Sequence, residues 1–182
     1  MGRRKTAFWL VVLVVLGSAV AGCASTAGSA KAVTGAPKEE VLGRYTKVAF
    51  VTSAGGEATP MSSLDRDRIL ALVIRKLKER APARFAELAA TTVDPETMKV
   101  TIAFTRYDEG NRFARLMLAG LGQVHIDADV ILEDATREAP LAKFEVTKTF
   151  AWGGIYGAST SIHDVEDGFA EAVAKAVLGQ AD

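Results

Sequence analysis

The sequence contains a single cysteine, Cys23, and no excess of charge of either sign, with 22 Lys+Arg against 22 Asp+Glu. One thiol cannot form an internal disulfide or a zinc site built from several thiolates. Zero net charge provides no broad basic surface, so nucleic acid is excluded as an expected partner. The apolar content of 49% over 182 residues is typical of one folded domain rather than of a disordered chain.

Long apolar runs are also missing, apart from one near the N-terminus. Residues 7–16 are ten consecutive apolar residues, preceded by the basic Arg3, Arg4 and Lys5. A membrane-spanning helix needs about 20 apolar residues, so this run is too short for a comfortable span. A basic segment, a short apolar segment and small residues before a processing point are typical of a secretory signal.

The apolar run leads to Val20-Ala21-Gly22-Cys23, in which small residues stand directly before the cysteine. This segment resembles the signal of bacterial lipoproteins, with Val20 where that family more often has Leu. The resemblance implies a signal peptide over residues 1–22, cleavage before Cys23, and lipid on the cysteine's sulfur and new amine. Several acyl chains make release from a membrane slow, whereas one chain binds only marginally. An uncleaved N-terminal membrane helix is the alternative.

The residues after Cys23 predict a location and a tether. In the Gram-negative sorting rule, Asp after the cysteine favours the inner membrane, and Ala24 therefore favours the outer membrane, facing the periplasm. Residues 23–43 are rich in Ala, Ser, Thr and Gly, so we expect a flexible lipid-anchored tether there. Residues 44–182 are expected to form a single periplasmic domain.

Apolar periodicity predicts two helices in that domain. Residues 69–77 carry apolar side chains at helical spacing after Ser62, the predicted N-cap. Pro82 interrupts this helix, and a shorter helical piece is expected through Phe85 and Leu88. A second amphipathic helix is predicted near the C-terminus, where apolar residues recur every four positions.

Four further runs predict strands, at residues 47–52, 98–105, 124–132 and 141–152. The last three alternate apolar and polar residues, which is typical of half-buried strands. The short polar connection at residues 133–140 predicts an antiparallel hairpin. The order is strand, helix, three strands, helix. It predicts an α+β fold with a mainly antiparallel sheet of about four strands and two main helices packed on one face.

His125, Asp127 and Asp129 are the one group whose residue types suit metal binding. Alternate residues share one face of a strand, and imidazole with two carboxylates binds divalent cations. Such residues lie about 6.6 Å apart, so chelation needs a further ligand from elsewhere. An ordinary solvated strand face accounts for the same residues, so no metal or other cofactor is expected. A metal-dependent hydrolase centred on these three residues remains an alternative.

Gly153, Gly154 and Gly157 predict a loop whose backbone is able to approach a ligand. A phosphate-binding loop normally lies between a parallel strand and a helix, often with a lysine close behind. Here the next lysine is Lys175, so a mobile loop is favoured. Neither a G-x-S-x-G motif nor a distinct carboxylate pair occurs, and the protein is therefore predicted not to be an enzyme.

An apolar stretch at residues 113–122 follows an acidic turn that begins at Asp108, the predicted cap of a helix. The favoured interpretation is a buried crossover in which Arg112 and Arg115 stay solvated while the apolar side chains pack inward. The other interpretation is an exposed apolar surface that touches lipid or a partner subunit. The candidate interaction surface in that case consists of Phe113, Leu116, Met117, Gly120 and Gly122.

Several features occur in order between Lys99 and Gly179: the acidic turn at 107–112, the glycine-bearing apolar stretch, the hairpin turn at 134–136 and a strand ending near 152–154. In this order they resemble an uncharacterised family of bacterial lipoproteins, known only as a domain of unknown function. The resemblance implies a lipoprotein but no catalytic residues.

We therefore expect a membrane-anchored lipoprotein that acts as a non-enzymatic binding or assembly domain of the bacterial envelope. Its expected partners are the membrane, through the N-terminal lipid, and an envelope protein or a second copy of the chain. A carrier of a small ligand or lipid, using a groove near residues 113–122, is the main alternative.

Overall fold

The computed structural model describes residues 28–35, 37, 39–54, 61–118 and 120–181. Within these ranges the chain forms six strands and five helices. In chain order they are β1 (Ser29–Thr34), α2 (Glu39–Gly43), β2 (Lys47–Ala54), α3 (Ser63–Arg80), β3 (Glu87–Leu88), β4 (Thr97–Asp108), α4 (Arg112–Met117), β5 (Val124–Asp134), β6 (Ala139–Phe150), α5 (Gly154–Ser159) and α6 (Ile162–Val177).

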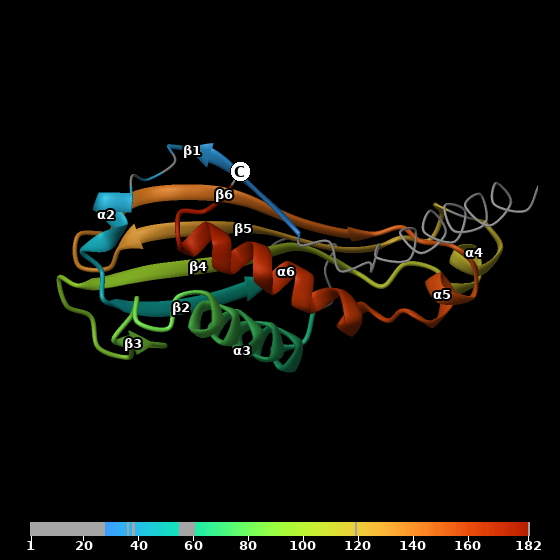
Figure 1. Ribbon diagram of the computed structural model, residues 1–182, viewed down its shortest axis with the longest axis horizontal. Helices are drawn as coiled ribbons and strands as arrows, with labels where there is room; N and C mark the ends of the chain where they lie inside the picture. Colours follow the sequence, from blue (N-terminus) through green and yellow to red (C-terminus); the bar gives the residue numbers. More distant parts are fainter. Residues whose placement is uncertain (1–27, 36, 38, 55–60, 119, 182) are drawn as a thin grey trace, which may run out of the picture.

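The molecule is elongated, with a body at one end and a narrow arm at the other (Figure 1). In the body, α3 and α6 pack side by side on one face of the sheet, as the sequence predicts. The arm consists of the ends of β4, β5 and β6, and α4 and α5 lie at its far end. None of the described helices is both long enough and apolar enough to cross a membrane.

The sheet has six strands in the order β1-β6-β5-β4-β2-β3, so the predicted number of about four is wrong. Three of its five strand pairings are antiparallel, but the sheet is mixed, because β2 pairs in parallel with both β3 and β4. The parallel pairing arises because α3 connects β2 to β4 as a crossover. The α+β class is confirmed, as is the antiparallel hairpin of β5 and β6.

The first strand lies within residues 23–43, the segment expected to be a flexible tether. β1 pairs with β6, beginning with Ser29 opposite Thr147. Just before it, the N–H of Gly28 donates to the carbonyl oxygen of Gly168 at 2.8 Å. The flexible-tether prediction is therefore wrong for β1 and α2. A run of small residues joins a sheet edge through backbone hydrogen bonds, which do not require a strong apolar pattern.

Alternation along the long strands places one side of each strand in the core. Every second residue of β5 is buried, from Val124 to Asp134. The opposite layer comes from α3 and α6, and the rings of Phe104 and Phe169 meet there with centroids 5.7 Å apart. Each large apolar side chain that is fully buried contributes about 1.5–3 kcal/mol. This core gives the body its stability.

The ends of α3 follow the local sequence signals. The Ser62 hydroxyl accepts a hydrogen bond from the N–H of Asp65, whose carboxylate accepts one from the N–H of Ser62, which confirms the predicted cap. The helix ends just before Pro82, also as predicted. The shorter helical piece expected through Phe85 and Leu88 is wrong. Leu88 belongs to β3, which pairs with β2 through the backbone.

A buried carboxylate joins α6 to α3 and β4. Glu166 is 1% exposed and accepts hydrogen bonds from the Arg68 guanidinium at 2.7 and 2.8 Å and from the Tyr107 hydroxyl at 2.7 Å. The Nδ1 atom of His163 lies 3.2 Å from the same carboxylate. Burial alone would raise the pKa of Glu166, but these hydrogen bonds, the Arg68 contact foremost, lower the pKa overall.

We expect Glu166→Gln to lower the free energy of unfolding by about 2 kcal/mol at neutral pH, because it removes the charge that Arg68 and Tyr107 bind. The folded-state pKa of Glu166 lies below the unfolded value of about 4.3. The stabilisation is therefore present above that pH and is lost as the pH falls through the folded-state pKa. Urea denaturation of both proteins across this range should show their difference shrinking in acid.

Glu79→Gln on α3 is the matched control. Glu79 is exposed and pairs with Arg75 at 3.6 Å, so its loss should cost at most about 0.5 kcal/mol. Equal destabilisation by the two substitutions, or a difference at Glu166 that persists unchanged in acid, would contradict the role assigned to the buried carboxylate.

Candidate functional site: an apolar tip on the arm

The arm begins where the helices stop covering the sheet. β4 continues to Asp108 and pairs with β5 as far as His125, with a register shift between Phe104 and Arg106. Such an irregularity increases the local twist and redirects the strand. β6 stays paired with β5 over the same length. The three strands thus carry α4 and α5 away from the body (Figure 1).

A tight turn connects β4 to α4. The Asp108 carboxylate accepts a hydrogen bond from the N–H of Gly110 at 2.8 Å, which lowers the pKa of Asp108. The Asn111 side chain accepts one from the N–H of Ala114 at 2.9 Å and is the N-cap of α4. The prediction of Asp108 as the cap is therefore wrong. Asp108 shapes the turn, and the cap lies three residues later.

Arg115 holds the end of the arm together and is fully buried. Its guanidinium donates to four backbone carbonyl oxygens: those of Glu109 and Gly122, each at 2.6 Å, Gly157 at 2.8 Å and Thr160 at 3.1 Å. These oxygens belong to the turn before α4, the loop after it, α5 and the residue that follows α5. Hydrogen bonds from a charged donor contribute about 1.5–3 kcal/mol each. One side chain therefore fixes the two short helices to each other.

Because Arg115 points inward, the apolar side chains of α4 face outward. Phe113 is 71% exposed, Met117 63% and Leu116 41%. The favoured interpretation of this stretch, with solvated arginines and inward apolar residues, is therefore wrong for Arg115 and for these three residues. At this end of the molecule, eight exposed large apolar side chains form what we call the apolar tip: Phe113, Leu116, Met117, Leu118, Leu121, Trp152, Ile155 and Tyr156.

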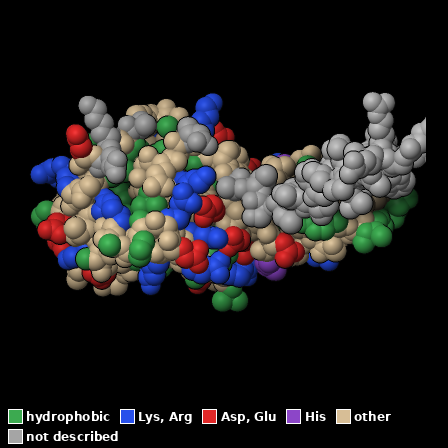
Figure 2. Space-filling model, viewed as in Figure 1, with side chains coloured by type: hydrophobic (Ala, Val, Ile, Leu, Met, Phe, Trp, Pro, Cys, Tyr) green, Lys and Arg blue, Asp and Glu red, His purple; other side chains and the backbone are tan. Residues whose placement is uncertain are grey.

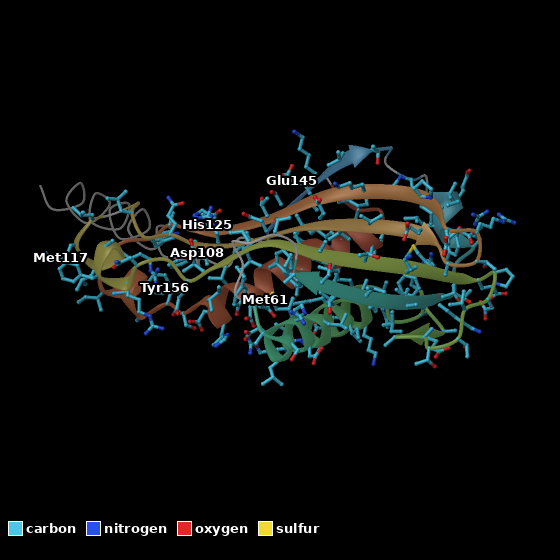
Figure 3. The ribbon with its side chains drawn as sticks, turned by 180° about the vertical axis from the view of Figure 1, so that it is seen from behind. Met61, Asp108, Met117, His125, Glu145 and Tyr156 are labelled. Atoms are coloured by element: carbon cyan, nitrogen blue, oxygen red, sulfur yellow. The ribbon has the colours of Figure 1, made fainter. Side chains whose placement is uncertain are left out.

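The apolar tip lies at the end of the arm that is farthest from the body. Figure 2 shows hydrophobic side chains gathered at that end, and Figure 3 places Met117 at its extremity with Tyr156 nearby. The ring of Trp152 meets that of Tyr156 edge-on, with centroids 6.2 Å apart. Two of the aromatic side chains of the tip, Trp152 and Tyr156, are therefore in contact with each other.

Two glycines allow the backbone at the tip to pack closely. Gly122 has a φ of +68°, and a Cβ atom there would lie 2.3 Å from the carbonyl oxygen of Asn111. A Cβ atom at Gly157 would lie 2.0 Å from the carbonyl oxygen of Trp152. Larger residues at either position would push apart the segments that Arg115 joins.

A cavity of about 590 Å³ lies beside the tip, between β6, α5 and α6. Its apolar lining includes Phe150, Trp152 and Tyr156, and Lys148 also lines it. Burial lowers the pKa of Lys148. The sequence favours a mobile loop at residues 153–157. In the structure Gly153 is the N-cap of α5 and residues 154–157 are its first four residues, next to this cavity, so that prediction is wrong.

Two of the three residues considered as metal ligands contact partners on β6. The Nδ1 atom of His125 lies 3.1 Å from the hydroxyl of Thr149, and Asp129 forms an ion pair with Lys143 at 2.9 Å. Burial raises the pKa of Asp127 and lowers that of His125. Within the part of the chain that the structure describes, no group of three or more His, Cys, Asp or Glu residues is placed to hold a metal ion.

The candidate surface predicted from the sequence lacked five residues of the apolar tip. Leu118 and Leu121 lie within the same apolar stretch, whereas Trp152, Ile155 and Tyr156 lie in a segment that was not considered for this surface. The available signal was their density: three large apolar residues within five positions, with no charged residue from Ala151 to Ser161. Gly153, Gly154 and Gly157 favoured the prediction of a loop. The glycines instead allow α5 to pack closely against the arm.

We expect Arg115→Met to loosen the tip while the body stays folded. The substitution removes the donors to four carbonyl oxygens, and each buried carbonyl left unsatisfied costs about 1–3 kcal/mol. Hydrogen exchange measured by mass spectrometry should show the amides of α4 and α5 exchanging at least about tenfold faster, with the core amides of the body unchanged.

Arg112→Met provides the control, because Arg112 lies on the same helix but is exposed and pairs with Glu109. It should leave exchange in α5 at the wild-type rate. Equal acceleration in both variants, or unfolding of the whole chain by Arg115→Met, would contradict a local role for the buried guanidinium.

Comparison with known proteins identifies a family and a shared fold. The family described as a domain of unknown function (DUF4410) matches the chain over residues 34–154. No curated protein matches the chain. A variant of the PelC dodecamer from Paraburkholderia phytofirmans is 17% identical with a TM-score of 0.51, and the match covers 85% of this chain and 98% of that chain. This likeness establishes a common fold.

Two further solved structures are more distant in shape. A PelC dodecamer in another crystal form from the same organism is 18% identical with a TM-score of 0.49, covering 85% of this chain and 99% of that chain. A candidate lipoprotein from Caulobacter crescentus CB15 is 18% identical with a TM-score of 0.43, covering 77% of this chain and 88% of that chain.

Proposed function

Because this chain belongs to the DUF4410 family, a domain of unknown function, we propose its role from its geometry. It is a lipid-anchored protein of the bacterial cell envelope, and it works by binding another envelope component or a copy of itself rather than by catalysis. The observation that carries the proposal is the apolar tip, because large exposed apolar surfaces mark the places where proteins meet other molecules.

The anchor is supported by the sequence around Cys23, which lies outside the described residues. A basic segment, a short apolar run and Val20-Ala21-Gly22 precede the cysteine, as in bacterial lipoprotein signals. Each buried methylene of an attached acyl chain contributes roughly 0.8 kcal/mol, so two or more chains hold a protein on a membrane stably. Ala24 supports placement at the outer membrane, on the periplasmic side.

A copy of the same chain is the protein partner that we propose first. The PelC structure that shares this fold is a dodecamer. In this chain, β1 is an edge strand of the sheet. Edge strands carry unpaired backbone groups that readily bind a further strand. The fold therefore offers a surface for self-association that is separate from the apolar tip.

We expect Cys23→Ser to abolish lipid attachment, since the cysteine sulfur is the site of modification. The full chain, expressed in a bacterial host and analysed by mass spectrometry, should carry lipid on Cys23. The Cys23→Ser chain should lack it and should no longer be processed at residue 22. Ser25→Ala, outside the Val20–Cys23 segment, should be lipidated normally. A wild-type chain that is processed elsewhere or unmodified would contradict the anchor.

Crosslinking tests self-association. The full chain in intact membranes should give products at multiples of one chain's mass when treated with an amine-reactive crosslinker, because copies share an interface. A product of constant mass that is no multiple of one chain would mean that the partner is a different envelope protein and not a second copy. Recovery of a single chain at every crosslinker concentration would contradict a binding role through a protein partner.

Binding of a small lipid is the second candidate function, and the cavity beside the tip favours it. Its volume of about 590 Å³ falls in the range of ligand sites, and Phe150, Trp152 and Tyr156 give it an apolar wall. Native mass spectrometry distinguishes a lipid carrier from a protein-binding domain, because only a carrier retains one lipid molecule that is not covalently bound.

A further inference from the structure

We propose that the apolar tip inserts into the interfacial layer of the lipid bilayer that holds the anchor, so that the arm stands on the membrane and keeps the body above it. This inference rests on the anchoring of Cys23 in the proposed function. It goes further by naming the occupant of the tip: a phospholipid surface rather than a protein.

The composition of the tip suits a bilayer interface. The eight residues of the apolar tip lie in segments 112–122 and 150–160. These two segments contain no acidic residue and only two basic ones, Arg112 and Arg115. Arg115 is buried against carbonyl oxygens, so Arg112 is the exposed cation of these two segments, and it pairs with Glu109 just outside them. Trp152 and Tyr156 are the residue types enriched where a membrane protein meets the lipid headgroups.

The backbone groups of the tip are also hydrogen-bonded, as an environment without water requires. Peptide groups without hydrogen bonds are costly where water is absent. The Asn111 side chain caps α4, and the guanidinium of Arg115 satisfies carbonyl oxygens of the adjoining turn, loop and helix. The polar bonds therefore lie inside the tip while its outer surface is apolar. An apolar surface of this kind settles about 5–10 Å into the headgroup region.

The position of the start of β1, together with the short segment that links it to Cys23, favours a membrane over other occupants of the tip. β1 runs antiparallel to β6, starting with Ser29 opposite Thr147. Ser29 therefore lies at the end of β1 that is nearer the tip. Cys23 stands five positions before Gly28 in the sequence, so the two residues can be at most about 17 Å apart. Cys23 must then lie within that distance of Gly28, the residue before β1.

The tip lies at a matching distance from the start of β1. From Thr147 to Trp152, β6 and the residues after it advance about 17 Å. In the opposite direction, the start of β6 at Ala139 lies about 26 Å from Thr147, beyond the reach of the anchored segment. A membrane that holds Cys23 therefore lies at the level of the tip and not at the far end of the body.

The fluorescence of Trp152 tests the contact directly. The sequence has two tryptophans, Trp9 and Trp152, and cleavage before Cys23 removes Trp9. Trp152 is then the sole reporter in the processed chain, and Trp9→Phe excludes emission from unprocessed chains. We expect the lipidated chain in phosphatidylcholine vesicles to emit at shorter wavelength than a solvent-exposed tryptophan. Replacing part of the phosphatidylcholine with its brominated form should quench most of that emission, because bromine quenches only on contact.

Three variants in the same Trp9→Phe chain test whether the quenching comes from contact between the apolar tip and lipid. Ile155→Asp places a charge on the outer face of the tip, where Ile155 is 84% exposed, and should remove most of the quenching. Val93→Asp changes an exposed apolar residue of the body and should leave quenching unchanged. Val51→Trp combined with Trp152→Phe moves the reporter to an exposed position on β2 and should give little quenching.

Two results would overturn the inference. Emission at short wavelength without quenching by brominated lipid would mean that protein covers the tip, and emission at long wavelength without quenching would mean that water does. Mass spectrometry of the same sample then shows whether Cys23 carries lipid, which separates failure of the tip insertion from failure of the anchor. With lipid present on Cys23, only the insertion of the tip is wrong. Without lipid there, the anchor of the proposed function is wrong as well.

Discussion

Strands and helices differ in length per residue, and this difference shapes the molecule. A strand advances about 3.3 Å per residue and an α-helix about 1.5 Å. The twelve residues of β6 therefore extend about 40 Å, whereas the sixteen residues of α6 extend about 24 Å. Even α3, with eighteen residues, extends only about 27 Å. The two helices cannot cover the whole length of the long strands, so the uncovered ends form the arm.

The uncovered ends need another source of order. Helices α4 and α5 have six residues each, too few to be stable alone or to bury a core between them. Arg115 supplies the order with hydrogen bonds to carbonyl oxygens instead of apolar packing. Because this arginine occupies the interior, the neighbouring apolar side chains of α4 are directed outward. The exposed tip and the buried charge thus have one cause.

The features that could be predicted from the sequence are those set by near neighbours. The alternation along β5 and the cap at Ser62 depend on residues a few positions apart, and the structure contains both. The small strands β1 and β3 are held by backbone hydrogen bonds at the sheet, which leave no apolar period to detect. The burial of Arg115 depends on carbonyl oxygens 42 and 45 residues further along the chain. Local spacing therefore could not reveal which face of α4 is buried.

The apolar core and the exposed apolar tip are consequently separated along the length of the molecule. The apolar core lies in the body, and the buried Glu166 links α3, α6 and β4 through Arg68 and Tyr107. The tip contributes little to that core, so its large apolar side chains are free to serve contact with another surface. A protein that relied on the same residues for its core could not present them outward without losing stability. Here the three long strands carry the tip beyond the helices, and β1 begins at its end nearer the tip.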